Sequence, residues 1–151
     1  MIENKFLIIG YGNMGKLHSE ILSSLIDNCK FHIIDTRKLK LGEKNLNQIE
    51  FKEINDINTY GGIIISTHSD SHLNYIKKLK KYNKLIFVEK PLVNKQKEID
   101  YFKSKKNRNI FCGFIETHNE LFEIAKENMT DDPFHIQVER ISPSISSSRI
   151  K

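Results

Sequence analysis

Residues 10–15 have the residue types and the spacing of a loop that binds phosphate groups. They read Gly-Tyr-Gly-Asn-Met-Gly, which is G-x-G-x-x-G, between a short apolar run and a helical pattern. In such a loop Gly10 makes the tight turn, Gly12 lets a pyrophosphate approach the backbone, and Gly15 lets the helix pack close to the strand. The free N–H groups at the start of the helix then hold the phosphates. The alternative is a glycine turn that binds no ligand.

An acidic residue stands where the ribose of a dinucleotide would lie. Asp35 ends the next apolar run, 25 residues after Gly10. A carboxylate at this position accepts hydrogen bonds from the ribose hydroxyls and repels a 2′-phosphate, which favours NAD over NADP. Arg37, two residues further on, can either stack on adenine or neutralise that phosphate, and the second role would favour NADP. The sequence therefore predicts NAD as the cofactor and leaves NADP open.

A third polar segment follows a later apolar run. Glu89-Lys90-Pro91 comes directly after residues 85–88, and open parallel sheets bind ligands at the carboxyl ends of their strands. Pro91 rigidifies this turn and disfavours a helical conformation for Lys90. A lysine held there can hydrogen-bond a substrate hydroxyl or keto oxygen, with Glu89 orienting it. The alternative from the residues alone is a solvated lysine in a loop.

Short apolar runs alternate with amphipathic segments along the whole chain. Strands are predicted at residues 5–9, 31–34, 49–54, 61–66, 85–88, 109–114 and 134–141. Helices are predicted at residues 13–28, 71–82, 95–105 and 119–128, with a short helix or turn at 38–45. Continuously apolar strands with helices between them are typical of a parallel sheet covered on both faces. We therefore predict an α/β protein with a Rossmann-type, doubly wound parallel sheet.

Length and composition exclude several classes of protein. A chain of 151 residues, 38% hydrophobic, is of a size to form one domain with an ordinary core. Cys29 and Cys112 are too few and too far apart for a disulfide scaffold or a zinc ribbon, and no metal site is predicted. No apolar run approaches the roughly 20 residues of a membrane helix, and no secretory signal is recognised. A cytoplasmic protein without membrane contact is expected.

The net charge of +5 does not by itself indicate a nucleic-acid partner. Only four of the 24 basic residues are arginine, and the excess is lysine. Nucleic-acid surfaces concentrate arginine and aromatic residues where phosphates and bases lie. We therefore expect a small-molecule ligand rather than a nucleic acid.

Three segments, in this order, resemble one enzyme family. Residues 10–18 read Gly-Tyr-Gly-Asn-Met-Gly-Lys-Leu-His, residues 65–72 read Ile-Ser-Thr-His-Ser-Asp-Ser-His, and residues 88–92 read Val-Glu-Lys-Pro-Leu. Together they resemble the N-terminal half of the glucose–fructose oxidoreductase, inositol dehydrogenase and MocA family (Gfo/Idh/MocA). Residues 113–116 and 136–143 resemble the family's segments around its entry into a second domain. Within the family, the chain most resembles the UDP-N-acetylglucosamine 3-dehydrogenases.

The resemblance implies a dinucleotide site and an active-site turn. The residues implied at the pyrophosphate are Tyr11, Gly12, Asn13 and Met14. Those implied at the adenosine end are Asp35, Thr36 and Arg37, and those at the nicotinamide end are Ser66, Thr67 and His72. The implied active-site turn consists of Glu89, Lys90 and Pro91. Within it Lys90 contacts the substrate and is the candidate catalytic residue.

The sequence departs from the family pattern at two places. His68 stands where the family usually has proline, and residues 117–120 replace a segment that usually reads close to Arg-Phe-Asn-Pro. Family members are also roughly twice as long, and their second domain supplies an aspartate and a histidine that act around hydride transfer. The sequence ends just before that segment is due. The family's full mechanism is therefore not expected within these residues.

The resemblance implies a domain boundary and a function. Residues 1–133 would form the dinucleotide-binding domain, and residues 134–151 a strand and tail from the start of the second domain. The expected function is NAD(P)-dependent oxidation of a hydroxyl on a sugar or nucleotide sugar, with this chain as the cofactor-binding half. The alternative is a stand-alone NAD-binding module or a truncated remnant without turnover. A homo-oligomer, formed through residues 134–141, or a separate chain that carries the substrate domain is the expected protein partner.

Overall fold

The computed structural model describes residues 4–103, 109–114 and 120–128. The contacts divide the chain into two units, residues 1–114 and 115–151. In the second unit the described segment is one helix, α4 (Glu120–Asn128). The predicted domain boundary at residue 133 and the predicted strand at residues 134–141 lie outside the described residues.

A six-stranded sheet runs through the first unit in the order β3-β2-β1-β4-β5-β6. Every neighbouring pair is parallel. This is the strand order of a Rossmann fold, so the predicted fold class is confirmed. The strands are β1 (Lys5–Ile9), β2 (Lys30–Ile34), β3 (Leu46–Gln48), β4 (Gly62–Ile65), β5 (Ile86–Val88) and β6 (Ile110–Cys112).

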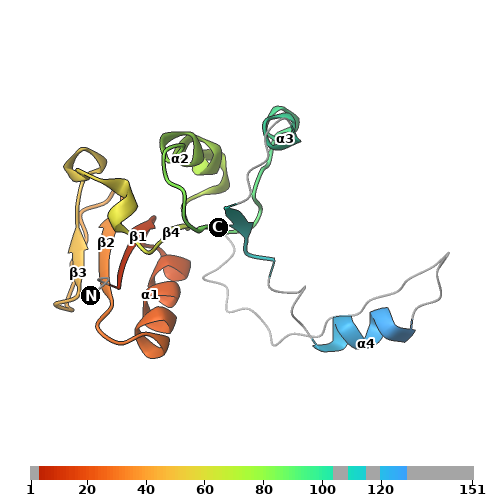
Figure 1. Ribbon diagram of the computed structural model, residues 1–151, viewed down its shortest axis with the longest axis horizontal. Coiled ribbons are helices and arrows are strands. Elements are labelled where there is room, and N and C mark those ends of the chain that lie inside the picture. The colour runs from red at the N-terminus through yellow and green to blue at the C-terminus, as the bar shows by residue number, and fades with distance from the viewer. Residues whose placement is uncertain (1–3, 104–108, 115–119, 129–151) are drawn as a thin grey trace, which may run out of the picture. The chain divides into compact units, whose positions relative to one another are not determined.

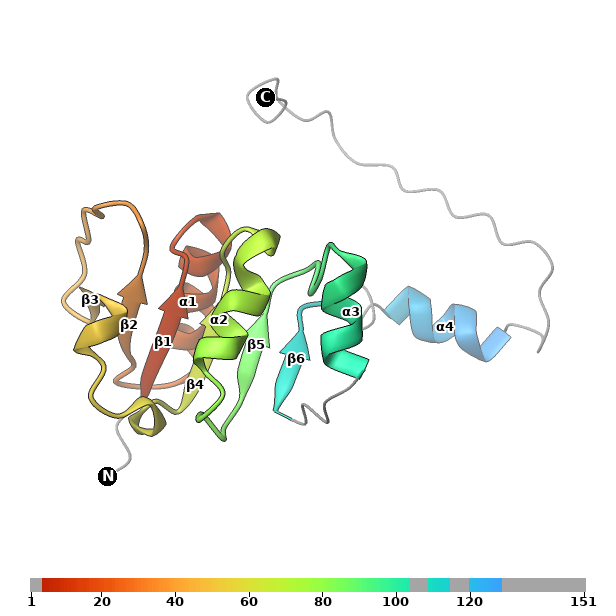
Figure 2. The same ribbon diagram turned by 90° about the horizontal axis from the view of Figure 1, so that it is seen from above.

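Helices lie on both faces of this sheet, as the doubly wound arrangement requires. In Figures 1 and 2, α1 (Asn13–Leu25) lies on one face, and α2 (His72–Lys78) and α3 (Gln96–Lys103) lie on the other. Three single turns of 3-10 helix interrupt the connections, η1 (Phe51–Glu53), η2 (Ile57–Thr59) and η3 (Ser69–Ser71). The chain crosses from one face to the other between β1 and β4, so the loops that follow these two strands diverge and leave room for a ligand.

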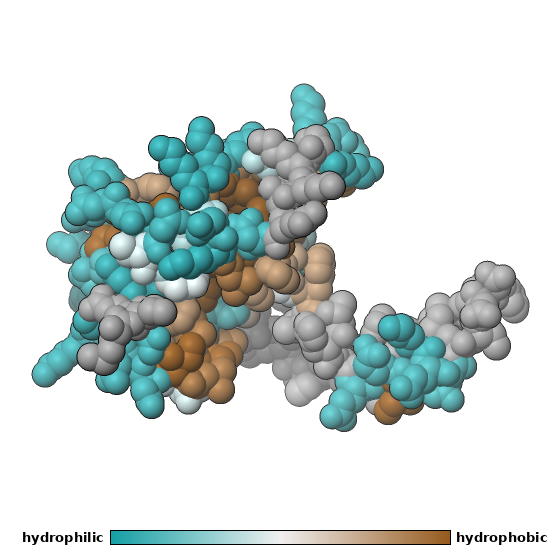
Figure 3. Space-filling model, in the orientation of Figure 1, coloured by the Kyte–Doolittle hydropathy of each residue, from teal (hydrophilic) through white to brown (hydrophobic). Residues whose placement is uncertain are grey.

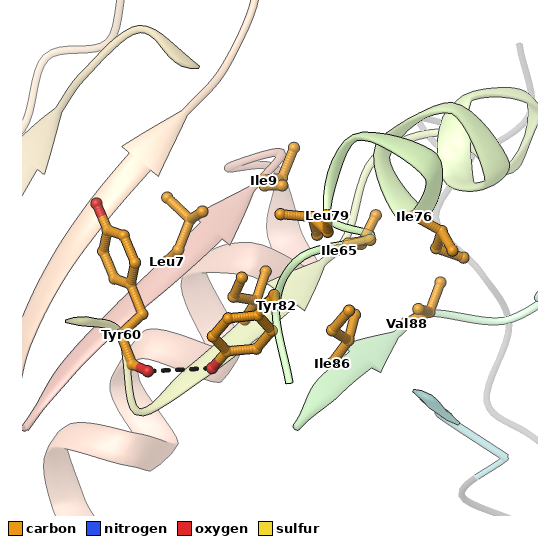
Figure 4. Close-up of a cluster of buried hydrophobic side chains, with 10 residues drawn as sticks. Leu7, Ile9, Tyr60, Ile65, Ile76, Leu79, Tyr82, Ile86 and Val88 are labelled. Atoms are coloured by element: carbon orange, nitrogen blue, oxygen red, sulfur yellow. Dashed lines mark hydrogen bonds between the residues drawn. The ribbon is translucent and has the colours of Figure 1, made fainter. Parts of the chain in front are cut away.

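The period of two along each strand divides the core into two layers. Leu7 and Ile9 of β1 pack in the cluster that also contains Ile76 and Leu79 of the α2 segment, whereas Ile8 packs in a separate cluster. The buried members of the first cluster are Leu7, Ile9, Tyr60, Ile63, Ile65, Ile76, Leu79, Tyr82, Ile86 and Val88, most of them labelled in Figure 4. This layer supports β4 and β5 directly behind the ends that carry the candidate site residues.

The predicted strand at residues 49–54 is wrong. The edge strand is instead the more polar segment Leu46–Gln48, which pairs with β2. Residues 50–53 close a 3-10 turn, in which the Glu50 carbonyl accepts a hydrogen bond from the Glu53 N–H at 3.0 Å. The Glu53 carboxylate in turn accepts the Glu50 N–H. This reciprocal capping stabilises a turn at residues whose apolar alternation resembles a strand.

The helix predicted at residues 13–28 is present but ends at Leu25, and its sheet-facing side differs from its most apolar side. The apolar residues whose helical spacing predicts this helix are Met14, Leu17, Ile21, Leu22 and Leu25. Four of these are exposed, with Leu25 at 74%, and Figure 3 shows apolar surface in this region. The buried residues of α1 are instead Gly15 and Ser19. Small side chains at these positions let the helix lie close against the sheet.

We predict that Gly15→Ala destabilises the fold and that Gly12→Ala is the matched control. A Cβ atom at Gly15 would lie 2.2 Å from the Gly10 carbonyl oxygen, whereas one at Gly12 meets nothing within 4 Å. The backbone must shift to relieve the first clash, which typically costs about 1–3 kcal/mol. Urea unfolding should show this loss for Gly15→Ala and less than about 1 kcal/mol for Gly12→Ala. Equal unfolding free energies for the two variants would contradict the close packing of α1.

Candidate functional site

The loop after β1 is held between the two neighbouring strands. The Gly10 N–H donates to the Ile34 carbonyl at 2.8 Å, and the Ser66 hydroxyl donates to the Gly10 carbonyl at 2.7 Å. Gly10 has a φ of +90°, and a Cβ atom there would lie 2.8 Å from backbone atoms of Ser66. Glycine is therefore required at this position by both conformation and space.

The start of α1 is open to an anionic ligand. Gly12 is the N-cap, its backbone is extended, and no side chain caps the helix. The first turn contains no acidic residue. The first N–H groups of a helix lack carbonyl partners within the helix, and the helix dipole makes this end positive. The backbone at Asn13 and Met14 thus offers donors to a phosphate without a competing carboxylate.

Asp35 and Arg37 form a closely bonded pair at the end of β2. The Asp35 carboxylate accepts hydrogen bonds from the Tyr11 N–H at 2.8 Å and from the Arg37 N–H and Nε at 2.9 Å each. A further bond of 2.9 Å comes from the Arg37 Nη2. The Asp35 side chain is 6% exposed and that of Arg37 is 64% exposed. The buried carboxylate is thus covered by a guanidinium that is itself mostly exposed to water.

The hydrogen bonds from Arg37 hold the pKa of Asp35 well below its usual range, although burial opposes this shift. The carboxylate also raises the pKa of Arg37. Asp35 is therefore ionised at neutral pH. Its two oxygens each accept two hydrogen bonds, which fills the capacity of a carboxylate. A ribose hydroxyl can bond Asp35 only by displacing one of these donors.

A cavity of about 340 Å³ lies where the chain crosses between the faces of the sheet. Its walls come from the loops after β1, β2 and β4 and from the start of α2. The predicted site residues that line it are Gly10, Gly12, Asp35, Thr36, Arg37, Ser66 and Thr67. The other residues that line it are Ile34, His68, Ser71 and Tyr75. Ser71 and Tyr75 are four residues apart around the start of α2, and this spacing was the available signal for a shared face.

Glu89, Lys90 and Pro91 form the turn after β5. The Glu89 N–H donates to the Ile65 carbonyl at 2.9 Å, which continues the pairing with β4. The Glu89 carboxylate accepts the Lys90 N–H at 3.3 Å. The peptide bond between Lys90 and Pro91 is cis, and both side chains are exposed. The turn is thus anchored at Glu89 and presents Lys90 to solvent.

His72 connects this turn to the loop after β4. Its ring nitrogens lie 3.1 Å from the Pro91 carbonyl oxygen and 3.0 Å from that of Thr67. The residue is 1% exposed and is not among those that line the cavity. The structure therefore places His72 beneath the predicted nicotinamide end, where it holds two loops together.

The side chain of Tyr11 also does not lie where a residue that binds a pyrophosphate would be expected. Its ring is buried, and its hydroxyl is 2.9 Å from the Ser19 hydroxyl. Burial raises the pKa of Tyr11. Since its N–H is donated to Asp35, Tyr11 fixes the loop to the end of β2. The cofactor contacts predicted for Tyr11 and His72, like those predicted for every other site residue, remain predictions.

Residues 4–103, 109–114 and 120–128 contain neither a cluster of metal-ligating side chains nor a membrane-spanning helix. No group of three or more His, Cys, Asp or Glu side chains is placed there to hold a metal ion. Among the same residues, no helix has the length and apolar character needed to cross a bilayer.

Comparisons with known proteins agree with this architecture. The model of an oxidoreductase family with an NAD-binding Rossmann fold matches residues 4–114. No curated protein matches the chain in sequence.

Solved structures share the fold. A myo-inositol dehydrogenase from Lactobacillus casei, in complex with NAD(H) and myo-inositol, has a TM-score of 0.64 and 19% identity over 82% of this chain and 40% of its own. A scyllo-inositol dehydrogenase from the same organism, with NAD(H) and scyllo-inositol, has a TM-score of 0.64 and 21% identity over 82% and 39%. A probable dehydrogenase from Thermotoga maritima has a TM-score of 0.65 and 22% identity over 82% and 40%. The chain spans about 40% of the length of these proteins.

We predict that Asp35 makes the stability depend on pH in the acid range. A carboxyl whose pKa is lowered by folding stabilises the protein above its unfolded pKa of about 3.9, and this contribution is lost as the pH falls. The difference in unfolding free energy between the wild type and Asp35→Asn should therefore shrink below about pH 4, by at most about 1.4 kcal/mol per pH unit. Asp100→Asn, at an exposed position, is the control. Denaturant unfolding between pH 7 and pH 2 measures both, and a constant difference for Asp35→Asn would refute the prediction.

Proposed function

The chain belongs to the Gfo/Idh/MocA oxidoreductase family with an NAD-binding Rossmann fold, and from this premise we propose that it binds the cofactor of an NAD(P)-dependent dehydrogenase acting on a sugar or polyol hydroxyl. The observation that carries the proposal is the cavity between the uncapped start of α1 and the ionised Asp35. A dinucleotide has matching chemistry, with phosphates in its middle and ribose hydroxyls beyond them.

The residues around the cavity fit a dinucleotide. The space where a Gly12 side chain would stand is open, so a pyrophosphate can approach the first N–H groups of α1. Asp35 is positioned to accept ribose hydroxyls once Arg37 moves aside. When bound, NAD supplies the hydride acceptor for alcohol oxidation. The contribution of this chain is to hold the phosphates, to orient the adenosine ribose and to form the walls of the cavity described above.

Lys90 is the proposed catalytic residue on the substrate side. Its turn follows β5, the strand next to β4, at the same edge of the sheet as the cavity. A lysine there can hydrogen-bond the hydroxyl oxygen that becomes a carbonyl. We propose a ring hydroxyl as the reacting group because two of the solved structures hold inositols. The resemblance seen in the sequence favours nucleotide sugars as the alternative substrates.

We predict that NADH binds more tightly than NADPH, because ribose hydroxyls can donate hydrogen bonds to Asp35 and a 2′-phosphate cannot. Asp35→Ala should narrow the difference, by about tenfold if one charged hydrogen bond to the ribose is lost. Gly12→Val should abolish binding without unfolding the domain, since its side chain would occupy the space of the pyrophosphate. Calorimetric titration measures all three, with circular dichroism as the folding control. A folded wild-type chain that binds neither cofactor would refute the proposed function.

We also predict that Lys90 affects turnover rather than cofactor affinity. The panel consists of NAD with inositols, free sugars and UDP-sugars, with NADH absorbance as the readout. For any substrate that is oxidised, Lys90→Ala should lower the rate by about a hundredfold, the scale of a lost proton-transfer or hydrogen-bonding group. Its NADH affinity should stay within about twofold of the wild type. Lys81→Ala, at an exposed position, is the control.

Two results would argue against this assignment. A Lys90→Ala variant with an unchanged rate would remove Lys90 from the catalytic role. A chain that binds NADH but oxidises no member of the panel would favour the binding-module alternative over an active dehydrogenase.

A further inference from the structure

His18 connects the cofactor-binding helix to the turn that carries Lys90. It lies on α1 three residues after Gly15, and its Nε2 is 2.7 Å from Oε1 of Glu89. The two side chains are 18% and 12% exposed. They are 71 positions apart in the sequence, so the pairing exists only in the folded domain. His18 was not among the predicted site residues.

The surroundings hold this pair in place. The His18 ring meets the Phe87 ring edge to face, with centroids 5.1 Å apart. A Cβ atom at Gly113 would lie 2.8 Å from the tip of that ring and 3.6 Å from the second carboxylate oxygen of Glu89. Gly113, the residue after β6, therefore lies close against Phe87 and Glu89. His18 is confined between the helix and the sheet and has little freedom to leave the carboxylate.

The pair also lies in a mostly apolar environment. His18 lines a cavity of about 190 Å³. Its other walls are formed by Phe6, Ile21, Leu22, Gly62, Ile63, Ile64, Leu85 and Phe87. A hydrogen bond is stronger in such surroundings, and a mostly buried carboxylate without a donor is costly. Glu89 consequently depends on His18 to keep its position.

We propose that His18 is a positioning residue, which fixes the Glu89 carboxylate and through it the backbone of Lys90. The second oxygen of Glu89 accepts the Lys90 N–H, so the chain of contacts runs from α1 through His18 and Glu89 to Lys90. The inference rests on the proposed function, because it assigns the turn its role in substrate contact. Through the same contacts, a phosphate bound at the start of α1 would change the position of the Lys90 turn.

The test uses three variants of the chain. His18→Leu removes the hydrogen-bond donor and roughly keeps the volume. His18→Gln places an amide N–H near the position of Nε2 and is expected to restore the contact. Leu25→Gln, on an exposed position of the same helix, is the matched control. Should His18→Leu fail to fold, Glu89→Gln perturbs the same contact from the other side.

The first measurement is made without any cofactor. In two-dimensional NMR spectra, the Lys90 amide and the Glu89 carboxyl carbon should shift in His18→Leu, return toward wild-type positions in His18→Gln and stay unchanged in Leu25→Gln. Wild-type positions of both signals in His18→Leu would overturn the proposal. Equal shifts in His18→Leu and His18→Gln would also overturn it, because a purely structural role of the imidazole would not be rescued by glutamine.

The second measurement adds ADP, which has the diphosphate and adenosine but no nicotinamide to contact the turn directly. Saturating ADP should shift the Lys90 amide signal in the wild type and in His18→Gln. In His18→Leu this shift should be smaller by at least about half. The affinity of His18→Leu for ADP should stay within about twofold of that of the wild type. An undiminished shift in His18→Leu would refute the transmission. A chain that binds neither ADP nor NADH would refute the proposed function, while the cofactor-free measurement would still test the positioning role.

Discussion

The contact between Gly15 and the Gly10 carbonyl governs the geometry of the whole site. The first turn of α1 lies directly against the end of β1, with no room for a side chain between them. This closeness directs the helix axis and fixes the position of its first N–H groups. It also brings the loop within reach of Ser66, the residue after β4, whose hydroxyl donates to the Gly10 carbonyl. The phosphate-binding end of the helix is therefore set by backbone packing rather than by a capping side chain.

The same packing makes α1 a connecting element as well as a binding element. One turn after Gly15, His18 reaches across the sheet to Glu89. At the start of α2, His72 joins the segment after β4 to the turn at Pro91. Two imidazoles thus hold the end of β5, one from each side of the sheet. A lysine on so short and so firmly held a turn can be positioned without being buried itself.

Much of this arrangement follows from short-range patterns. The apolar strands, the glycine spacing and Asp35 are each visible within a window of a few residues, and the fold they predict is the one observed. The edge strand was misplaced because Ile49 and Phe51 alternate like a strand, while the turn that overrides them depends on two glutamates. The side of α1 that packs on the sheet could not be predicted from the apolar pattern either, because its buried residues are Gly15 and Ser19 rather than its larger apolar residues.

The partners that sequence reasoning missed are those that only the fold brings together. His18 and Glu89 belong to different motifs, and no local spacing relates them. Tyr75 lines the cavity because the loop after β4 and the start of α2 lie beside the loop after β1. The observed boundaries of the helices also differ by a few residues from the predicted ones, because caps and 3-10 turns such as Ser69–Ser71 form at the ends.

The pairing of Asp35 with Arg37 bears on how a cofactor would be discriminated. Asp35 stays ionised across the physiological range because its pKa is lowered, so its charge is always present. Arg37 neutralises that charge at short range, and net repulsion of a 2′-phosphate is correspondingly weakened. The remaining difference lies in hydrogen bonding, because ribose hydroxyls can replace the donors of Arg37 on the carboxylate and a phosphate cannot. A preference for NAD at this site would therefore arise mainly from the acceptors that Asp35 offers once the exposed guanidinium moves away.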